Sequence, residues 1–301
     1  MKFSLWIIFL GMLAPVAIAA PFTIENAERQ VREKYPDITR PSDELPTHVV
    51  ADENLTYAEI AGEVLQLDIY RPEKRAPGAI VLIVHGGGWE SGSRQMERPL
   101  AKHLAARGYV AVPVSYRLGP AGKFPGALDD LKAAIHWLRA NAAKLALDDR
   151  PVGVIGGSAG GQLAALLRAE NQAGLRIGAV VDIDGLADFT GEALVNQQAA
   201  NPSAPVRFLG GNFNERPEVW SAASAITHVH AGSAPTLFLN STVTNPILPG
   251  REEMRDKLKA AGVAAEIVVI PDTPHPFWLF HPWFERVVDE SDRFLRAHLK
   301  P

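Results

Sequence analysis

The residues best suited to chemistry are the five from Gly156 to Gly160, which form the pattern G-x-S-x-G with Ser158 at its centre. They follow the apolar run Pro151 to Ile155, typical of a buried strand, and precede Gln162 to Asn171, typical of a helix. In this context the turn is so tight that only small residues fit beside the serine. We expect a strained serine backbone, an exposed hydroxyl and the positive end of the helix beside it. Such a hydroxyl can attack a carbonyl carbon.

A second glycine-rich segment, His85 to Trp89, has the sequence H-G-G-G-W and follows the apolar run Val81 to Val84. Three consecutive glycines after a strand let the backbone turn its N–H groups towards a ligand. Loops of this type form the oxyanion hole beside a serine elbow. We therefore expect the N–H groups of Gly87, Gly88 and Ala159 to bind the negative charge that develops on a substrate oxygen.

A serine hydroxyl is a poor nucleophile until a base removes its proton, and the chain offers nine histidines. His275 stands between two prolines, just after the apolar run Ile267 to Ile270, in the last predicted loop of the sheet. We predict that it is the base. His85 belongs to the glycine-rich loop and is expected to be structural. Six others are expected in the core or on the surface: His103, His136, His228, His230, His281 and His298.

Together these motifs resemble those of the α/β-hydrolase superfamily, in its hormone-sensitive-lipase-like and bacterial carbohydrate-esterase branch. The resemblance covers the chain from about Leu65 to Leu299. It implies an α/β fold, an ester-hydrolysing activity, Ser158 as nucleophile, Gly87 and Gly88 in the oxyanion hole and His275 as base. The matching segments are Leu67 to Pro72, His85 to Trp89, Val114 to Leu118, Phe124 to Leu138, Gly156 to Gly161, and His275.

The acid of the triad does not follow the pattern of this family. Its usual place, after the next-to-last strand and before a proline, is occupied by Asn245. An amide carries no negative charge, and replacing a triad Asp by Asn lowers turnover roughly 10⁴-fold. Either the acid lies elsewhere, or the protein is a poor enzyme.

A replacement acid is present one strand earlier, where the apolar run Ile177 to Ile183 includes Asp182 and is followed by Asp184. Some lipases of the superfamily carry their acid after this strand. Asp184 stands at the strand tip, so we predict a triad of Ser158, His275 and Asp184. The alternatives are Asp184 as a cap of the following loop, Asp272 as a second choice and Asp188 as a third.

The composition sets the class of protein and its compartment. The chain has 301 residues, 47% apolar, with a net charge of −4 and no cysteine. The charge gives no reason to expect nucleic-acid or anionic-membrane binding, and the absence of cysteine excludes disulfides and thiolate metal sites. No metal-ligand spacing is visible, so we predict no metal and no cofactor.

The N-terminus has the features of a signal peptide: Lys2, the apolar run Phe3 to Leu13 and small residues up to Ala19. We therefore predict a signal peptide over residues 1–19 and a secreted or periplasmic, bacterial protein. We expect no membrane contact after cleavage, and the oligomeric state stays open.

The rest of the chain predicts an α/β fold with a mostly parallel central sheet, helices on both faces and a small helical cap. We expect an arm over residues 20–50, which packs over the domain or its active-site mouth, and one domain over residues 51–301, with the cap at about residues 186–232. Alternation from Val64 to Tyr70 predicts a half-exposed antiparallel edge strand. Buried strands are predicted at residues 79–84, 110–115, 151–155, 177–183, 236–239 and 267–270, and further helices at residues 98–107, 127–145, 251–261 and 284–298.

Large aromatic residues are concentrated after His275, among them Phe277 and Trp278, and Trp89 adjoins the oxyanion glycines. They are either a hydrophobic plug or a wall on which sugar rings stack. With export and the resemblance, the second interpretation favours an esterase that removes acyl or methyl groups from plant cell-wall carbohydrate, such as acetylated xylan or pectin. Its substrate would be a small ester or an esterified polysaccharide. The alternatives are a broad short-chain carboxylesterase, an arylformamidase-like hydrolase, and a catalytically weak carbohydrate-binding pseudo-esterase.

Overall fold

The computed structural model describes residues 20–74, 78–145, 147, 150–169, 174–197, 203–242 and 250–299. The predicted signal peptide, residues 1–19, and Asn245 lie outside these residues, so export stays a prediction of the sequence. Within the described ranges no helix has the length and apolar character that a bilayer crossing requires.

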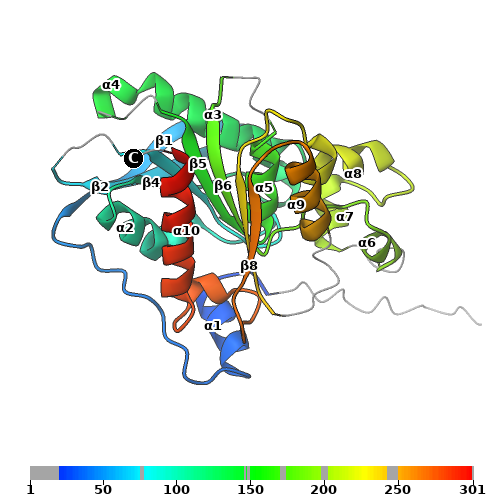
Figure 1. The fold of residues 1–301 in the computed structure, drawn as a ribbon, viewed down its shortest axis with the longest axis horizontal. Helices are drawn as coiled ribbons and strands as arrows, with labels where there is room; N and C mark the ends of the chain where they lie inside the picture. Colours follow the sequence, from blue (N-terminus) through cyan, green and yellow to red (C-terminus); the bar gives the residue numbers. More distant parts are fainter. Residues whose placement is uncertain are drawn as a thin grey trace, which may run out of the picture.

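The described residues form a sheet of eight strands in the order β1-β2-β4-β3-β5-β6-β7-β8 (Figure 1). The first two strands are antiparallel to each other and β2 is antiparallel to β4, whereas all pairs from β4 to β8 are parallel. The central strands are continuous apolar runs because helices cover both of their faces. The strands are β1 (Val49–Ile60), β2 (Glu63–Pro72), β3 (Ile80–Val84), β4 (Val110–Val114), β5 (Val152–Gly157), β6 (Ile177–Ile183), β7 (Thr236–Asn240) and β8 (Ala265–Val269).

Helices cover the sheet on both sides, and each side has its own apolar core. One core includes residues of α3 (Gly126–Ala140), α5 (Ala159–Leu167) and α9 (Arg251–Ala260). The opposite core includes residues of α1 (Ile24–Arg32), α2 (Arg98–Ala106) and α10 (Phe284–Leu299). The α/β architecture predicted from the sequence is therefore confirmed, and it brings the carboxyl ends of the parallel strands to one edge.

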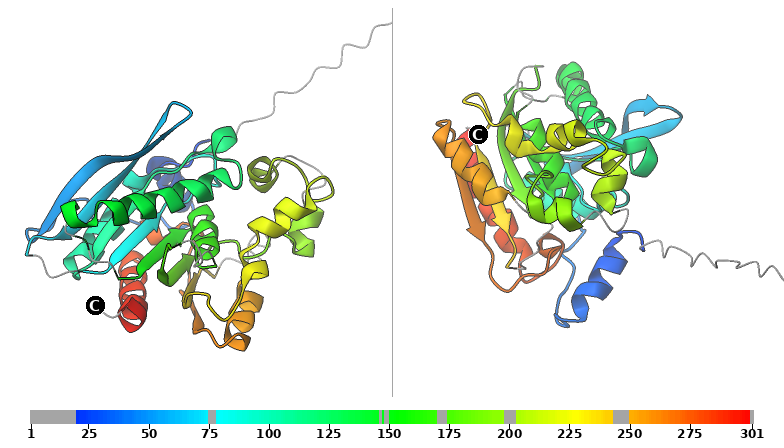
Figure 2. Two further views of the ribbon diagram at one scale, coloured as in Figure 1. Left: turned by 90° about the horizontal axis from the view of Figure 1, so that it is seen from above. Right: turned by 90° about the vertical axis from the view of Figure 1, so that its right-hand side faces the viewer.

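Between β6 and β7 the described residues include the helices α6 (Glu192–Gln197), α7 (Ala204–Leu209), α8 (Pro217–Ala223) and the short η4 (Ala225–His228). These helices lie at the opposite end of the sheet from the long β1–β2 hairpin (Figure 2). Phe208 of α7 stacks on Trp89, with ring centroids 4.7 Å apart. The inserted helices thus contact the glycine-rich loop after β3.

Three expectations from the sequence need correction. The strand from Val64 to Tyr70 is not an edge strand, because β1 pairs along its outer side. The helix expected over residues 127–145 is divided at Asn141 into α3 and α4 (Ala142–Leu145). The arm contains helix α1, which was not predicted. Thr23 caps this helix, its side chain accepting a hydrogen bond from the N–H of Asn26.

The arm packs against the body at several places, two of which lie near the ends of α1. The N–H of Phe22 donates a hydrogen bond to Ser91 Oγ at 2.9 Å, beside the glycine-rich loop. At the other end Tyr35 packs edge-on against Trp283, with ring centroids 5.1 Å apart, so α1 lies beside the start of α10 (Figure 1). The arm therefore connects the loop that follows β3 with the segment that leads into α10.

Candidate active site

Ser158 occupies the sharp turn between β5 and α5, with φ 55° and ψ −117°. This is a backbone conformation that non-glycine residues rarely adopt, and it carries strain of about 1–3 kcal/mol. The neighbours are glycines for steric reasons. A Cβ on Gly156 would collide with the carbonyl of Gly160, and a Cβ on Gly160 would collide with the carbonyl of Val84. The sequence thus forces the elbow that was predicted, and the side chain of Ser158 stays half-buried at the sheet edge.

The structure brings together the three side chains predicted as a triad. His275 Nε2 lies 2.9 Å from Ser158 Oγ, and His275 Nδ1 lies 3.1 Å from Asp184 Oδ2. The three come from the β5–α5 turn, the loop after β8 and the tip of β6. The side chain of His275 is 31% exposed, so solvent reaches the triad at the imidazole ring. This geometry lets the imidazole accept the serine proton while the carboxylate holds the other ring nitrogen.

Asp184 is fully buried and has three hydrogen-bond partners. Besides His275, the N–H of Ser241 and Nη1 of Arg251 each donate to its Oδ1 at 2.8 Å. Burial opposes ionisation, but the pKa of the Asp184 carboxyl is held below its ordinary value by His275 first, then by the Arg251 guanidinium and the Ser241 N–H. Asp184 is therefore held as a carboxylate.

The other candidate acids have partners elsewhere. Asp272 accepts a hydrogen bond from the Tyr35 hydroxyl at 3.3 Å. Asp188 accepts from the N–H and the hydroxyl of Thr190, both at 2.7 Å. Asp182 is buried beneath the site and accepts from the N–H of Gly185 at 2.7 Å. Of the carboxylates in the described residues, Asp184 is the one in hydrogen-bond contact with His275.

The glycine-rich loop lies directly beside the nucleophile, since a Cβ on Gly86 would lie 3.3 Å from Ser158 Cβ. Gly87 and Gly88 have φ values of +122° and +62°, which only glycine adopts readily. Within the described part of the chain, no hydrogen bond uses the N–H groups of Gly87, Gly88 or Ala159. These three predicted oxyanion donors are therefore without a protein acceptor next to Ser158.

His85 has the structural environment expected for it. Its ring is buried, stacks on Tyr116 with centroids 4.4 Å apart, and has Nδ1 2.8 Å from the carbonyl of Gly86. Burial lowers the pKa of His85 to about 4, so the ring is neutral. The stacked rings of His85 and Tyr116 therefore support the start of the glycine-rich loop.

The aromatic residues predicted to bind sugar do not form an exposed wall. Phe277 and Trp278 are 0% and 1% exposed, and Trp89 is 6% exposed. The indole of Trp278 instead packs under the elbow, where a Cβ on Gly157 would collide with it. The stacking interpretation is therefore wrong for Phe277 and Trp278, because both rings are needed in the core on the α10 side of the sheet. Trp89 is held in place by its stack on Phe208.

Three residues at the site were not singled out from the sequence. Gln162 accepts from Nε1 of Trp89 and donates to the carbonyl of Ala223, both at 2.9 Å. Glu97 is 3.4 Å from Nε1 of Trp278, and burial raises its pKa to about 7. Arg251 contacts Asp184. Only Arg251 leaves a signal in the sequence, because a cation in the first turn of a helix is opposed by the helix dipole and implies another partner.

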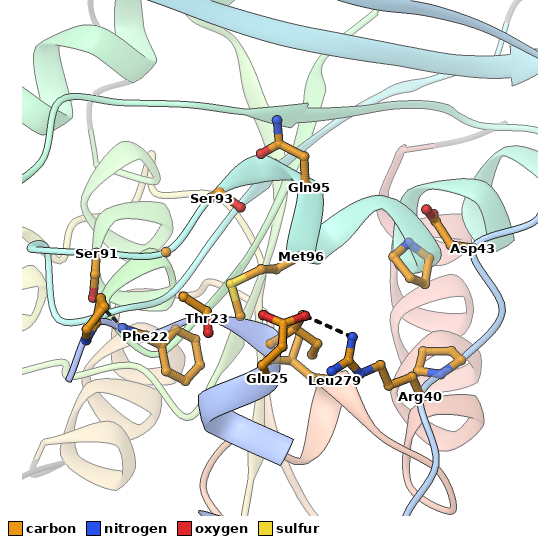
Figure 3. Close-up of a pocket in the computed structure, with 15 residues that line it drawn as sticks. Phe22, Thr23, Glu25, Arg40, Asp43, Ser91, Ser93, Gln95, Met96 and Leu279 are labelled. Atoms are coloured by element: carbon orange, nitrogen blue, oxygen red, sulfur yellow. Dashed lines mark hydrogen bonds and ion pairs between the residues drawn. The ribbon is translucent and has the colours of Figure 1, made fainter. Parts of the chain in front are cut away.

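A cavity of about 550 Å³ lies between the arm and the body (Figure 3). Phe22, Met96 and Leu279 give it an apolar lining, and the ion pair of Glu25 with Arg40 stands at its side. Neither Ser158 nor His275 lines it. The cavity therefore belongs to the seam that the arm makes with η1 (Arg94–Glu97) and α2.

Several known proteins similar to this chain are named as esterases or ester hydrolases. Esterase LipQ of Mycobacterium tuberculosis is 30% identical over 242 residues, which cover 75% of this chain and 57% of LipQ. Ethyl acetate hydrolase of Pseudomonas putida is 30% identical over 294 residues, covering 90% of this chain and 87% of that protein. The chain spans little more than half the length of the first curated relatives it matches.

Among solved structures, Thermogutta terrifontis esterase 2 phosphonylated by sarin superimposes with a TM-score of 0.68 and 25% identity, covering 84% of this chain and 96% of the esterase. The fold is therefore that of the α/β-hydrolases, as the sequence predicted. The family model BD-FAE matches residues 67–250, which run from within β2 to the residue before α9 and include the glycine-rich loop, the elbow and Asp184. The chain belongs to the BD-FAE family of α/β-hydrolases.

Proposed function

We propose that the protein is a serine carboxylesterase that works through an acyl-enzyme on Ser158. The observation that carries the proposal is the continuous relay from Asp184 through His275 to Ser158, with contacts of 3.1 and 2.9 Å. Unused N–H groups stand beside it on the glycine-rich loop. A nucleophile, a base, an acid that orients the base and donors for an oxyanion are the parts that acyl transfer requires.

In the first half of the reaction, Ser158 Oγ attacks the ester carbonyl carbon while His275 Nε2 takes its proton. The negative charge that forms on the carbonyl oxygen is bound by the N–H groups of Gly87, Gly88 and Ala159. The carboxylate of Asp184 stabilises the imidazolium. When the carbon–oxygen bond breaks, the leaving alcohol takes the proton from His275, and the acyl group stays on Ser158.

In the second half, a water molecule attacks the acyl carbon and gives a proton to His275. A second oxyanion forms in the same place and collapses. The bond to Ser158 breaks, Oγ regains its proton from the imidazolium, and a carboxylic acid leaves. The enzyme returns to its starting protonation state, so atoms and charges balance over the cycle.

For the substrate, we propose acyl or methyl esters on plant cell-wall carbohydrate. The support is the family, since BD-FAE stands for bifunctional acetyl xylan and feruloyl esterases. The rings of Phe277 and Trp278 lend no support, because they are buried.

A short-chain carboxylesterase is the second candidate. It is favoured by the likeness to an ethyl acetate hydrolase over 90% of the chain and to Thermogutta terrifontis esterase 2, whose structure is known with butyrate bound. The contact of the Asp184 carboxylate with His275 argues against a catalytically weak pseudo-esterase.

The test compares wild type with Ser158→Ala and, as a matched control, Ser221→Ala, an exposed serine on α8. A fluorophosphonate probe should label wild type and the control but not Ser158→Ala. Release of acetate, methanol and ferulate from acetylated xylan, pectin and feruloylated arabinoxylan is then measured beside hydrolysis of p-nitrophenyl acetate and butyrate. We expect Ser158→Ala to lose activity on every ester.

Two outcomes have different meanings. If Ser158→Ala is labelled and hydrolyses esters like wild type, the serine mechanism is wrong. If wild type cleaves the small synthetic esters but releases nothing from the polysaccharides, the carbohydrate substrate is wrong and the short-chain esterase stands.

A further inference from the structure

The buried carboxylate of Asp184 is shared between His275 and the cation of Arg251. Its Oδ2 faces His275 Nδ1 at 3.1 Å, and its Oδ1 accepts from Arg251 Nη1 at 2.8 Å. The side chain of Arg251 is 10% exposed, so this ion pair is screened little by solvent. An acid whose only role is to stabilise the imidazolium has no need of a second cation.

We propose that Arg251 is a positioning residue which, acting through Asp184, holds His275 in its working orientation and extends the pH range of activity towards acid. The inference rests on the proposed function, in which neutral His275 is the base. Two effects of Arg251 act together. Its guanidinium holds the carboxylate in the orientation that aims Oδ2 at the imidazole, and its positive charge disfavours a second positive charge on the ring across the shared carboxylate.

The groups that surround the pair are few. Ser158 and Asp184 are hydrogen-bonded to His275, and the ring of Trp278 packs edge-on against it, with centroids 5.7 Å apart. Behind Asp184 lies Asp182, whose pKa burial raises to about 7, with Arg251 acting in the opposite direction. Glu97 reaches the imidazole only through Trp278. Arg251 is therefore the one permanent cation in contact with the relay, among the residues that the structure describes.

The test is the pH dependence of kcat/KM, whose acid limb reports the protonation of the free enzyme's base. In Arg251→Met we expect this limb to move upward by about one pH unit, a typical effect of one nearby charge. At pH values below the acid limbs of both proteins, kcat/KM of Arg251→Met is then about tenfold lower than that of wild type. Arg251→Lys keeps the positive charge, so the acid limb of its kcat/KM should lie at the same pH as in wild type. This holds even if the loss of the planar guanidinium lowers kcat. Arg251→Gln is measured as a second neutral variant in case Arg251→Met does not fold.

Two controls isolate the cause. Arg255→Met removes a cation of the same helix that pairs with Asp256 on the surface, and it should leave the limb in place. The Asp182→Asn background removes the other buried carboxyl that titrates nearby, and the shift caused by Arg251→Met should persist there. Folding of each variant is checked by circular dichroism and thermal unfolding.

The inference is overturned if the neutral variants keep the wild-type limb, or if Arg251→Lys moves it as far as Arg251→Met does. Lower kcat in all variants without a moved limb would likewise assign Arg251 a purely structural role. These outcomes leave the proposed function intact, since that fails only if Ser158→Ala stays active.

Discussion

At the scale of the residue, the acid proposed here lies one strand earlier than the resemblance predicts. Asn245 stands where the resemblance predicts an acid, and Asp184, one strand earlier, contacts His275 at 3.1 Å. The carboxyl ends of β6 and β7 are neighbours in the sheet, so a carboxylate on either strand can reach a histidine after β8. The function of the acid is thus set by the place of its carboxylate and not by its position in the motif.

Replacing Asp184 by Asn should lower kcat roughly 10⁴-fold, because an amide can hold the imidazole in the wrong tautomer and cannot stabilise the imidazolium. Asp272→Asn, which loses only an exposed contact with the Tyr35 hydroxyl, serves as the matched control and should stay within a few-fold of wild type. Steady-state hydrolysis of p-nitrophenyl acetate by both folded variants is the measurement. Near-wild-type turnover of Asp184→Asn would assign the acid to another residue.

The residues of the site differ in how far the sequence could predict them. Ser158, His275 and the glycines stand in motifs whose geometry is local, so their placement followed from the chain itself. Asp184 could be proposed only because strand alternation brought it to a strand tip. Gln162 could not be found in this way, since its partner Trp89 is 73 residues away. The position of Arg251 at a helix start indicates a partner but does not identify Asp184, which is 67 residues away.

At the scale of the element, the β5–α5 elbow is shaped by what packs under it. The indole of Trp278 fills the space beside Gly157, so even a methyl group has no room there. Trp278, predicted as part of a binding surface, instead packs against the elbow of the nucleophile, and Phe277 packs against Trp278. Sequence alone could not separate these roles, because an aromatic cluster after a catalytic loop is compatible with either.

Gly157→Ala should therefore lower turnover by about 10²-fold or more, because the elbow must shift and a displacement near 1 Å is enough for such a loss. The matched double variant Gly157→Ala/Trp278→Phe has a smaller ring in the same place. We expect it to lose less than the sum of the two single variants, in units of ΔΔG‡ from kcat/KM. Full activity of Gly157→Ala would show that the indole does not constrain the elbow.

The sheet itself was predictable in its buried strands and less so at its margins. Strands β3 to β7 are continuous apolar runs between turn residues, and their expected ranges match within one residue or two. The outer β1 strand carries charges and a register shift between Asp52 and Leu55, so its pattern is weak. Helix α1 was missed because three prolines nearby made the arm resemble an irregular segment.

At the scale of the whole molecule, the stability depends on carboxyl groups that are buried without a cation. Glu97 is 3% exposed, and among the described residues its hydrogen-bond donor is the indole N–H of Trp278 at 3.4 Å. Burial raises its pKa from 4.5 to about 7. The folded protein therefore keeps this proton over a pH range in which the unfolded chain has already lost it, and Glu97 couples proton binding to folding.

From this difference we predict that the free energy of unfolding contributed by Glu97 is fully present below pH 4.5 and is lost as the pH rises towards 7 and above, by about 3 kcal/mol in all. Glu97→Gln keeps an acceptor for Trp278 but cannot ionise. Urea unfolding at pH 5 and pH 8 should show that wild type loses up to about that much more stability than Glu97→Gln between the two conditions. Asp182, whose pKa is raised in the same direction, is present in both proteins and cancels in the comparison. Equal losses in wild type and Glu97→Gln would mean that Glu97 is already ionised in the folded protein, and that its burial is compensated by a partner other than Trp278.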